Sequence, residues 1–216
     1  MRSSATTGIP GKLLGRARGL VVGVLLVVPF AAAAAQAAPI DIVAIGDSNT
    51  NGDGIIRASA WPAQLEKLLR AKGYDARIRN SGVSGDTTGE ALARLGRAVP
   101  EGTDIAIVFV GRNDRRFHTP VKTTRRNIDE IVGRLRKREI EVLLIGFDNY
   151  DFADIAKAHG AAYYPDFFAG VTRNGKKLRR YVLPLDPIRH LNPSGHRVIA
   201  ERLLPSVEPL VQRVNR

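Results

Sequence analysis

Residues 40–50, which read IDIVAIGDSNT, contain the stretch that decides the fold. Ile40 to Ile45 form a short apolar run rich in β-branched residues, and Gly46 follows, a pattern typical of a buried strand that ends in a sharp turn. Ser48 comes directly after this turn. Gly-Asp-Ser is also ordinary turn chemistry, so this stretch alone favours a plain turn over a reactive serine.

Predicted strands and helices alternate along the rest of the chain. Further strands are expected over 75–79, 105–110, 141–145 and 161–164, and helices over 61–71, 119–138, 152–158 and 193–204, with 178–192 as a loop. Such an order predicts an α/β fold, in which a parallel sheet of about five strands lies between two layers of helices. In such sheets, ligands bind beyond the carboxyl ends of the strands.

The first 38 residues are predicted to be a cleavable signal peptide. Four basic residues accompany an apolar run over 20–30, and Ala35-Gln36-Ala37 has the small-x-small pattern of a cleavage site. The alternative is an uncleaved membrane anchor, but the uninterrupted apolar stretch is shorter than the ~20 residues that a spanning helix needs. We therefore expect cleavage near Ala37, a periplasmic or secreted protein, and a single domain over residues 39–216.

Charge and cysteine usage limit the classes of function. The chain has a net charge of +12, and loss of the four basic residues in the signal peptide would leave +8. A basic surface favours anionic partners such as a phospholipid surface or an acidic polysaccharide, without indicating specific recognition of nucleic acid. Equally, the Arg and Lys side chains could serve only to keep the domain soluble. The absence of cysteine excludes disulfides, thiolate metal sites and a cysteine nucleophile.

Polar residues gather in three further segments, each after a predicted strand or in the last loop. Residues 80–88 read NSGVSGDTT, residues 111–114 read GRND, and residues 186–192 read DPIRHLN. We expect them to meet Ser48 beyond the carboxyl ends of the strands. Together they supply a hydroxyl, a backbone N–H in a glycine turn, a side-chain amide, an imidazole and a carboxylate, which are the groups that an acyl-transfer site needs.

These blocks resemble those of the SGNH hydrolases, also called GDSL-type esterases and lipases. They stand in the family's order over nearly the whole predicted domain: GDSN at 46–49, SGDTT at 84–88 with ALARL at 91–95, GRND at 111–114 and HLNPSGH at 190–196, with Trp61-Pro62 in the first helix. The similarity is greatest to the small periplasmic enzymes that act as thioesterase, arylesterase and lysophospholipase. It implies the three-layer α/β/α sandwich of that family, a flavodoxin-like arrangement, and no cofactor.

The resemblance also implies a role for each matching residue. Ser48 is then the nucleophile and His190 the general base. The oxyanion hole would take the backbone N–H groups of Ser48 and Gly85 and the side-chain amide of Asn113. These roles agree with the chemistry of acyl transfer, in which the donors bind charge that develops only at the tetrahedral stage.

Two positions depart from the family pattern. Asn49 stands where leucine is commoner, and we expect this to change packing rather than chemistry. Family members usually place the acid that orients the histidine three residues before it, where this chain has Pro187. Asp186, four residues before His190, is the nearest acid in sequence and is expected to be the third member of the triad. Because proline has a fixed φ, a backbone carbonyl remains the alternative group for orienting His190.

The remaining polar residues are interpreted as structural. Asp47 and Asp114 border the blocks and are expected to hold the loops by hydrogen bonds. Asp53, Asp86 and Asp114 fit no compact ligand set, so no metal site is predicted. His196 is interpreted as a packing or helix-surface residue.

The predicted function is an exported serine esterase that hydrolyses small to medium acyl or aryl esters through an acyl-enzyme, with thioesters and lysophospholipids as further candidates. Residues 147–158 are fewer than in the relatives that the chain resembles, so we expect a shorter or more open acyl pocket. Two alternatives stay open: deacetylation of an envelope or plant polysaccharide, and a non-catalytic binding module. The expected partners are a small-molecule or lipid ester and, through charge, an anionic membrane surface.

Overall fold

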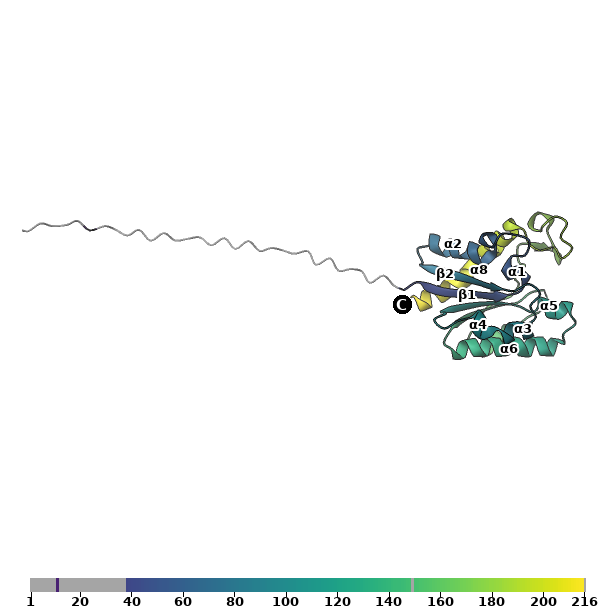
Figure 1. Ribbon diagram of the computed structural model, residues 1–216, viewed down its shortest axis with the longest axis horizontal. Coiled ribbons are helices and arrows are strands. Elements are labelled where there is room, and N and C mark those ends of the chain that lie inside the picture. The colour runs from purple at the N-terminus through teal and green to yellow at the C-terminus, as the bar shows by residue number, and fades with distance from the viewer. Residues whose placement is uncertain (1–10, 12–37, 149, 216) are drawn as a thin grey trace, which may run out of the picture. The chain divides into compact units, whose positions relative to one another are not determined.

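Five parallel strands make up the central sheet of the domain (Figure 1). The structure, a computed structural model, describes Gly11, residues 38–148 and residues 150–215. The strand order is β2-β1-β3-β4-β5. The strands are β1 (Ile40–Gly46), β2 (Ala76–Gly82), β3 (Ile105–Phe109), β4 (Glu141–Ile145) and β5 (Ala162–Tyr164). The predicted α/β fold with a parallel sheet of about five strands is confirmed.

Helices cover both faces of this sheet, which gives the predicted three layers (Figure 1). On one face, α2 (Trp61–Ala71) packs against α8 (Pro193–Val214). The other face carries α3 (Thr88–Ala93), α4 (Leu95–Ala98), α6 (Val121–Lys137) and α7 (Ala153–Ala158). The chain runs from β1 through α2 out to β2 and then returns past β1 to β3. Crossovers between parallel strands are right-handed almost without exception, so this reversal of direction moves the helices to the opposite face.

The register of the strands brings their carboxyl ends to one edge of the sheet. Gly46 pairs with Gly82 on one side and with Phe109 on the other. The two short helices α1 (Ser48–Asn51) and α5 (Arg112–Arg116) begin just beyond this edge. The GDS, SGDTT and GRND blocks therefore leave the sheet at the same level, as the sequence predicts.

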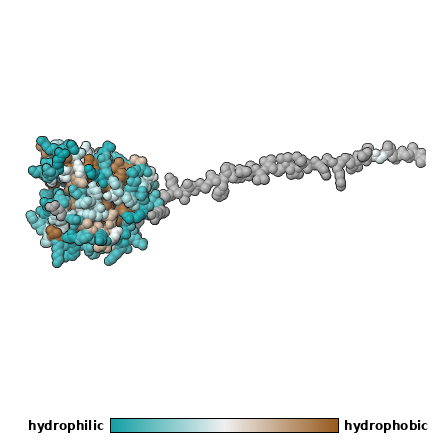
Figure 2. Space-filling view, turned by 180° about the vertical axis from the view of Figure 1, so that it is seen from behind, coloured by the Kyte–Doolittle hydropathy of each residue, from teal (hydrophilic) through white to brown (hydrophobic). Residues whose placement is uncertain are grey.

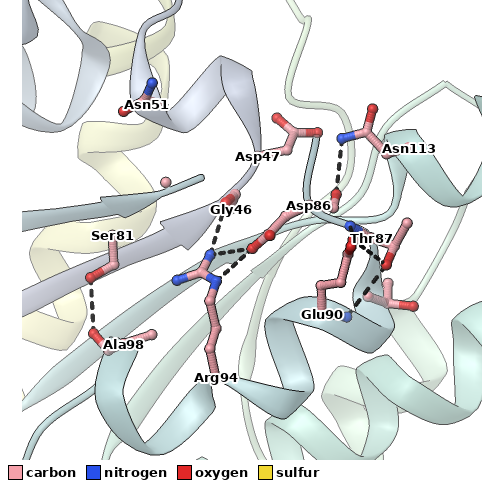
Figure 3. A network of polar contacts seen from close by, with 12 residues as sticks. Gly46, Asp47, Asn51, Ser81, Asp86, Thr87, Glu90, Arg94, Ala98 and Asn113 are labelled. Atoms are coloured by element: carbon pink, nitrogen blue, oxygen red, sulfur yellow. Dashed lines mark hydrogen bonds and ion pairs between the residues drawn. The ribbon is translucent and has the colours of Figure 1, made fainter. Parts of the chain in front are cut away.

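Strand β2 is longer than the predicted 75–79. It continues through Asn80 and Ser81, which pair with Ala44 and Ile45 of β1. Both polar side chains find partners at this edge. Asn80 Nδ2 donates to Thr50 O at 2.8 Å. Ser81 Oγ donates to the carbonyl oxygen of Ala98 at 2.9 Å (Figure 3). Side-chain hydrogen bonds thus allow a strand where composition indicates a loop.

Helix α8 runs ten residues beyond the predicted end at Leu204. It passes through Pro205 and Pro209, each of which lacks the N–H that an interior helical position donates. The apolar face nevertheless continues through this part of the helix, and its side chains are buried: Val207, Leu210 and Val211. Packing of this face outweighs the local preference of proline.

The predicted signal peptide lies outside the described residues, apart from Gly11 and Ala38. Within the part of the chain that the structure describes, no helix combines the length and the apolar character that crossing a membrane requires.

Most of the surface in Figure 2 is hydrophilic, with hydrophobic residues in small separate spots. Among the described residues, the large apolar side chains that are exposed lie on segments at the carboxyl edge of the sheet: Ile56, Val83, Phe117, Val121, Leu185 and Ile188. Scattered exposed apolar residues are normal, but their restriction to one edge places them around the candidate site.

Candidate active site

Ser48 is presented by a tight turn between β1 and α1. Asp47 caps α1, because its Oδ1 accepts from Asn49 N at 2.8 Å and from Asn49 Nδ2 at 3.0 Å. Gly46 leaves no room for a side chain, since a Cβ there would lie 2.2 Å from Thr50 Oγ1 and 2.4 Å from the carbonyl oxygen of Phe109. The Gly-Asp-Ser stretch is therefore a tightly packed turn that projects the serine hydroxyl beyond the sheet edge.

A chain of hydrogen bonds links Ser48 to His190 and Asp186. Ser48 Oγ lies 3.0 Å from His190 Nε2, and His190 Nδ1 lies 2.7 Å from Asp186 Oδ2. Because a carboxylate faces Nδ1, that nitrogen carries the proton in neutral imidazole, and Nε2 accepts from the serine hydroxyl. The imidazole is about nine-tenths buried, at 9% exposure for the residue.

Pro187 directs the carboxylate of Asp186 toward the histidine. Residues 186–189 form a β-turn in which Arg189 N donates to Asp186 O at 3.0 Å, and proline at the second position of such a turn has a suitable φ. Asp186 Oδ1 accepts from Ile188 N at 2.9 Å, and Oδ2 accepts from His190 N at 2.8 Å. The four-residue spacing thus places the acid, rather than a backbone carbonyl, at Nδ1.

The same hydrogen bonds keep Asp186 ionised. Burial acts to raise the pKa of this carboxyl group, but the backbone N–H groups of His190 and Ile188 and the imidazole outweigh burial and lower the pKa below its ordinary value. A charged carboxylate therefore faces the imidazole, where it can stabilise an imidazolium.

The expected oxyanion donors lie on two neighbouring turns. Gly85 adopts a φ of +86°, a conformation that favours glycine, in the turn between β2 and α3. Asn113, on α5, donates from Nδ2 to the carbonyl oxygen of Asp86 at 2.9 Å, so this bond ties the asparagine to the glycine turn (Figure 3). Among the described residues, none accepts a hydrogen bond from the backbone N–H of Ser48 or Gly85.

Arg94 and Asp86 brace these turns, a contact that sequence reasoning missed (Figure 3). Arg94 Nε donates to Asp86 Oδ2 at 2.5 Å, and Nη2 donates to Gly46 O at 3.2 Å. Burial raises the pKa of Asp86, and the arginine partly offsets this effect. Arg94 thus connects the residue before Asp47 to the residue after Gly85. The sequence contained a signal for this contact, because Arg94 belongs to the ALARL block at 91–95.

Asp114 links the start of α3 to α6 by hydrogen bonds. This fully buried residue accepts from Thr88 N at 2.7 Å, from Thr88 Oγ1 at 2.5 Å and from Thr124 Oγ1 at 3.3 Å. Asp47 has a similar local role through its cap of α1, and burial raises its pKa despite the hydrogen bonds from Asn49.

The other candidates lie apart from this chemistry. His196 is 1% exposed and accepts from Trp61 N through Nδ1 at 3.1 Å, so it joins α8 to α2 as a packing residue. Asp53 accepts from Ser84 Oγ at 2.5 Å. No group of three or more His, Asp or Glu suited to a metal ion occurs within residues 38–148 and 150–215.

A cavity of about 660 Å³ opens beside Ser48. Its lining includes Arg112, Asn113, Phe147 and Phe168. Thr172, Gly175 and Lys177 of the hairpin formed by β6 (Thr172–Arg173) and β7 (Lys176–Lys177) also line it, as do Pro187 and Ile188. Sequence reasoning did not find this hairpin. Of the short segment 148–151, Asn149 lies outside the described residues.

Known proteins resemble this chain in both sequence and fold. Residues 44–198 match the model of the GDSL-like lipase/acylhydrolase family. An arylesterase of Vibrio mimicus is 30% identical over 121 residues, which are 56% of this chain and 60% of that protein. Esterase TesA of Pseudomonas aeruginosa is 29% identical over 150 residues, which are 63% of this chain and 75% of that protein.

Solved structures give the same result. A crystal structure of TesA superposes with a TM-score of 0.69 at 26% identity, covering 79% of this chain and 99% of that one. AlinE4, an esterase of the SGNH-hydrolase family, superposes with a TM-score of 0.63 at 29% identity, covering 84% and 99%. The chain therefore belongs to the GDSL-like lipase/acylhydrolase family, whose members that match here are carboxylic ester hydrolases.

Proposed function

We propose that the protein is an exported serine esterase that hydrolyses small to medium acyl or aryl esters through an acyl-enzyme. The observation that carries the proposal is the hydrogen-bonded chain from Ser48 through His190 to Asp186, which opens on the cavity beside Ser48. Two matching relatives, the arylesterase and esterase TesA, support the same chemistry.

In this mechanism, Ser48 Oγ attacks the ester carbonyl while its proton moves to His190 Nε2. The carbonyl oxygen becomes an oxyanion, which the N–H groups of Ser48 and Gly85 and the amide of Asn113 stabilise. The C–O bond to the alcohol then breaks, and the imidazolium returns the proton to the leaving oxygen. Water adds to the acyl group by the same route, releasing the acid and restoring Ser48.

Export and partners follow from other parts of the chain. The signal pattern in the first 38 residues supports a periplasmic or secreted location. The exposed apolar side chains at the carboxyl edge, together with the net positive charge, support contact with an anionic membrane surface and add lysophospholipids to the candidate substrates. Thioesters remain a further candidate because they undergo the same attack at an acyl carbon.

The test is hydrolysis of a panel of p-nitrophenyl esters, from acetate to palmitate, by the wild-type chain and by Ser48→Ala. The wild type should hydrolyse the shorter esters, and the variant should lose nearly all of kcat while keeping its thermal midpoint, because the hydroxyl contributes chemistry rather than core packing. Ser206→Ala, on the distant helix α8, is the matched control. Retention of more than about a tenth of kcat by Ser48→Ala would show that the nucleophile is wrong.

A further inference from the structure

Cationic side chains outnumber carboxylates around the cavity beside Ser48. Arg112, Arg115, Arg116 and Lys177 line it, whereas the carboxylates among its lining residues are those of Asp47 and Asp148. A concave site that carries one sign of charge concentrates ligands of the opposite sign. The positive charge should therefore favour esters that carry a negative charge.

Asp148 neutralises only part of this charge. Its Oδ2 accepts both from Arg112 Nη1 at 3.0 Å and from Arg115 Nη1 at 2.9 Å, so one carboxylate is shared between two guanidinium groups. Each guanidinium has five N–H donors, and most of them remain available to a ligand.

Lys177 is the most constrained of the cations. Its Nζ donates to Arg189 O at 2.7 Å and lies 4.7 Å from the centre of the Phe168 ring. Within the described part of the chain, no carboxylate lies within ion-pair distance of this amine. Burial, together with the positive charge of Arg112, lowers the pKa of Lys177 to about 8.

Arg112 shares the ring that Lys177 contacts and stands next to the oxyanion site. Its Cζ lies 4.6 Å from the centre of the Phe168 ring, and Arg112 immediately precedes Asn113 on α5. Both cations contact one buried aromatic ring and both line the cavity, so an anionic group held there would be attracted by both charges. Ser48 lines the same cavity as Arg112 and Lys177, so an ester bound at the Ser48 hydroxyl lies in the field of both cations.

We propose that this cavity is a subsite for an anionic group, so that the preferred substrates are esters that carry a carboxylate, phosphate or sulfate near the ester bond. The subsite rests on the proposed esterase function and narrows its substrate class. Arg112 and Lys177 are the binding groups.

The experiment compares charged esters with neutral esters of similar shape. One pair places the charge on the acyl side, mono-p-nitrophenyl glutarate against p-nitrophenyl valerate. The other places it on the alcohol side, 4-acetoxybenzoate against its methyl ester. After subtraction of the uncatalysed rate, kcat/KM should favour the charged member of at least one pair by about tenfold, the size of one charge-assisted hydrogen bond. The pair that shows the preference identifies which side of the ester occupies the cavity.

Variants and salt then test the groups responsible. Lys177→Met and Arg112→Met should each lower the ratio of charged to neutral kcat/KM at least fivefold. Lys137→Met removes the same charge from the exposed end of α6 and should leave the ratio unchanged. Raising NaCl from about 0.05 M to about 0.5 M should lower the wild-type ratio, which needs no variant to fold.

The outcomes separate the subsite from the esterase. Hydrolysis of the neutral esters with no preference for either charged ester would overturn the subsite and leave the esterase standing. If no ester is hydrolysed, the proposed esterase function is wrong. Calorimetric titration of Ser48→Ala with glutarate then tests the subsite by itself. Saturable binding that Lys177→Met weakens about tenfold would support an anion site, and the absence of binding would overturn it.

Discussion

Replacement of Asp186 by asparagine should lower kcat by about a thousandfold with little change in KM. The carboxylate faces His190 Nδ1 at 2.7 Å, and both side chains are mostly buried, with 17% and 11% of their surfaces exposed. At an effective dielectric constant of about 20, opposite charges about 4 Å apart attract by about 4 kcal/mol. This attraction exists only while His190 is protonated, so its loss raises the barrier by about 4 kcal/mol, or about 10³-fold in rate.

Asparagine cannot replace the carboxylate in either orientation of its amide. The Asp186 oxygens accept from three N–H groups, those of Ile188, His190 and the imidazole. If the amide oxygen faces His190, the amide nitrogen faces Ile188 N–H, and the reverse orientation opposes donors at the histidine. We therefore expect the thermal midpoint to fall as well as the rate.

The assay is steady-state hydrolysis of a neutral p-nitrophenyl ester at one fixed pH, which gives kcat and KM separately for the wild type and Asp186→Asn. Asp104→Asn, which also removes a carboxylate that accepts a backbone N–H but lies at the opposite edge of the sheet, should leave both parameters unchanged. A fall of less than about fivefold in kcat, with His190→Ala inactive, would reduce the triad to a dyad.

Three further predictions concern positioning, metal and pH. Arg94→Met should lower the free energy of unfolding by ~3 kcal/mol, because it leaves the buried carboxylate of Asp86 unpaired. The same variant should lower kcat by about tenfold, and Arg94→Lys should recover part of both losses. An unchanged kcat in Arg94→Met would show that the contact between Arg94 and Asp86 is only structural. Exhaustive treatment with EDTA should leave the rate unchanged, whereas a loss that a divalent ion restores would contradict the mechanism. Burial, with lesser repulsion from nearby cations, lowers the pKa of His196 to about 4, so the stability that neutral His196 provides above pH ~6.5 is lost as pH falls toward 4. Urea unfolding should show a loss of up to ~3 kcal/mol over that range that is smaller in His196→Gln and retained in His159→Gln, and equal losses in all three would refute this cause.

Much of the fold could be predicted because a strand buried between two layers of helices must be apolar on both faces, and such runs are visible in the sequence. Strand β3 is a continuous apolar run that is buried throughout, and the strand-helix alternation requires a parallel sheet. The prediction was wrong where tertiary contacts outweigh local preference. Asn80 and Ser81 extend β2 through side-chain hydrogen bonds, and α8 continues through two prolines because its apolar face is covered.

The sequence could predict which segments contribute to the candidate site but not how their side chains are oriented. Ser48 and His190 are 142 residues apart in sequence, and their meeting depends on the register of the sheet. The orientation of Asp186 depends on a turn that places Pro187 at its second position, which a count of residues before His190 does not indicate. The subsite for an anionic group could not be predicted from the sequence, because Arg112 of the GRND block and Lys177 of the β6-β7 hairpin are far apart in the chain and only the fold brings both to one cavity.

Covalent labelling with a fluorophosphonate, followed by intact-mass determination and peptide mapping, identifies the nucleophilic hydroxyl. An activated serine hydroxyl is required for this reaction, so a single adduct on Ser48 is predicted, absent in Ser48→Ala and strongly slowed in His190→Ala. Ser84 is the internal control, since this exposed hydroxyl donates to Asp53 and contacts no histidine among the described residues. No adduct, or an adduct on Ser84 in place of Ser48, would contradict the assignment of the nucleophile.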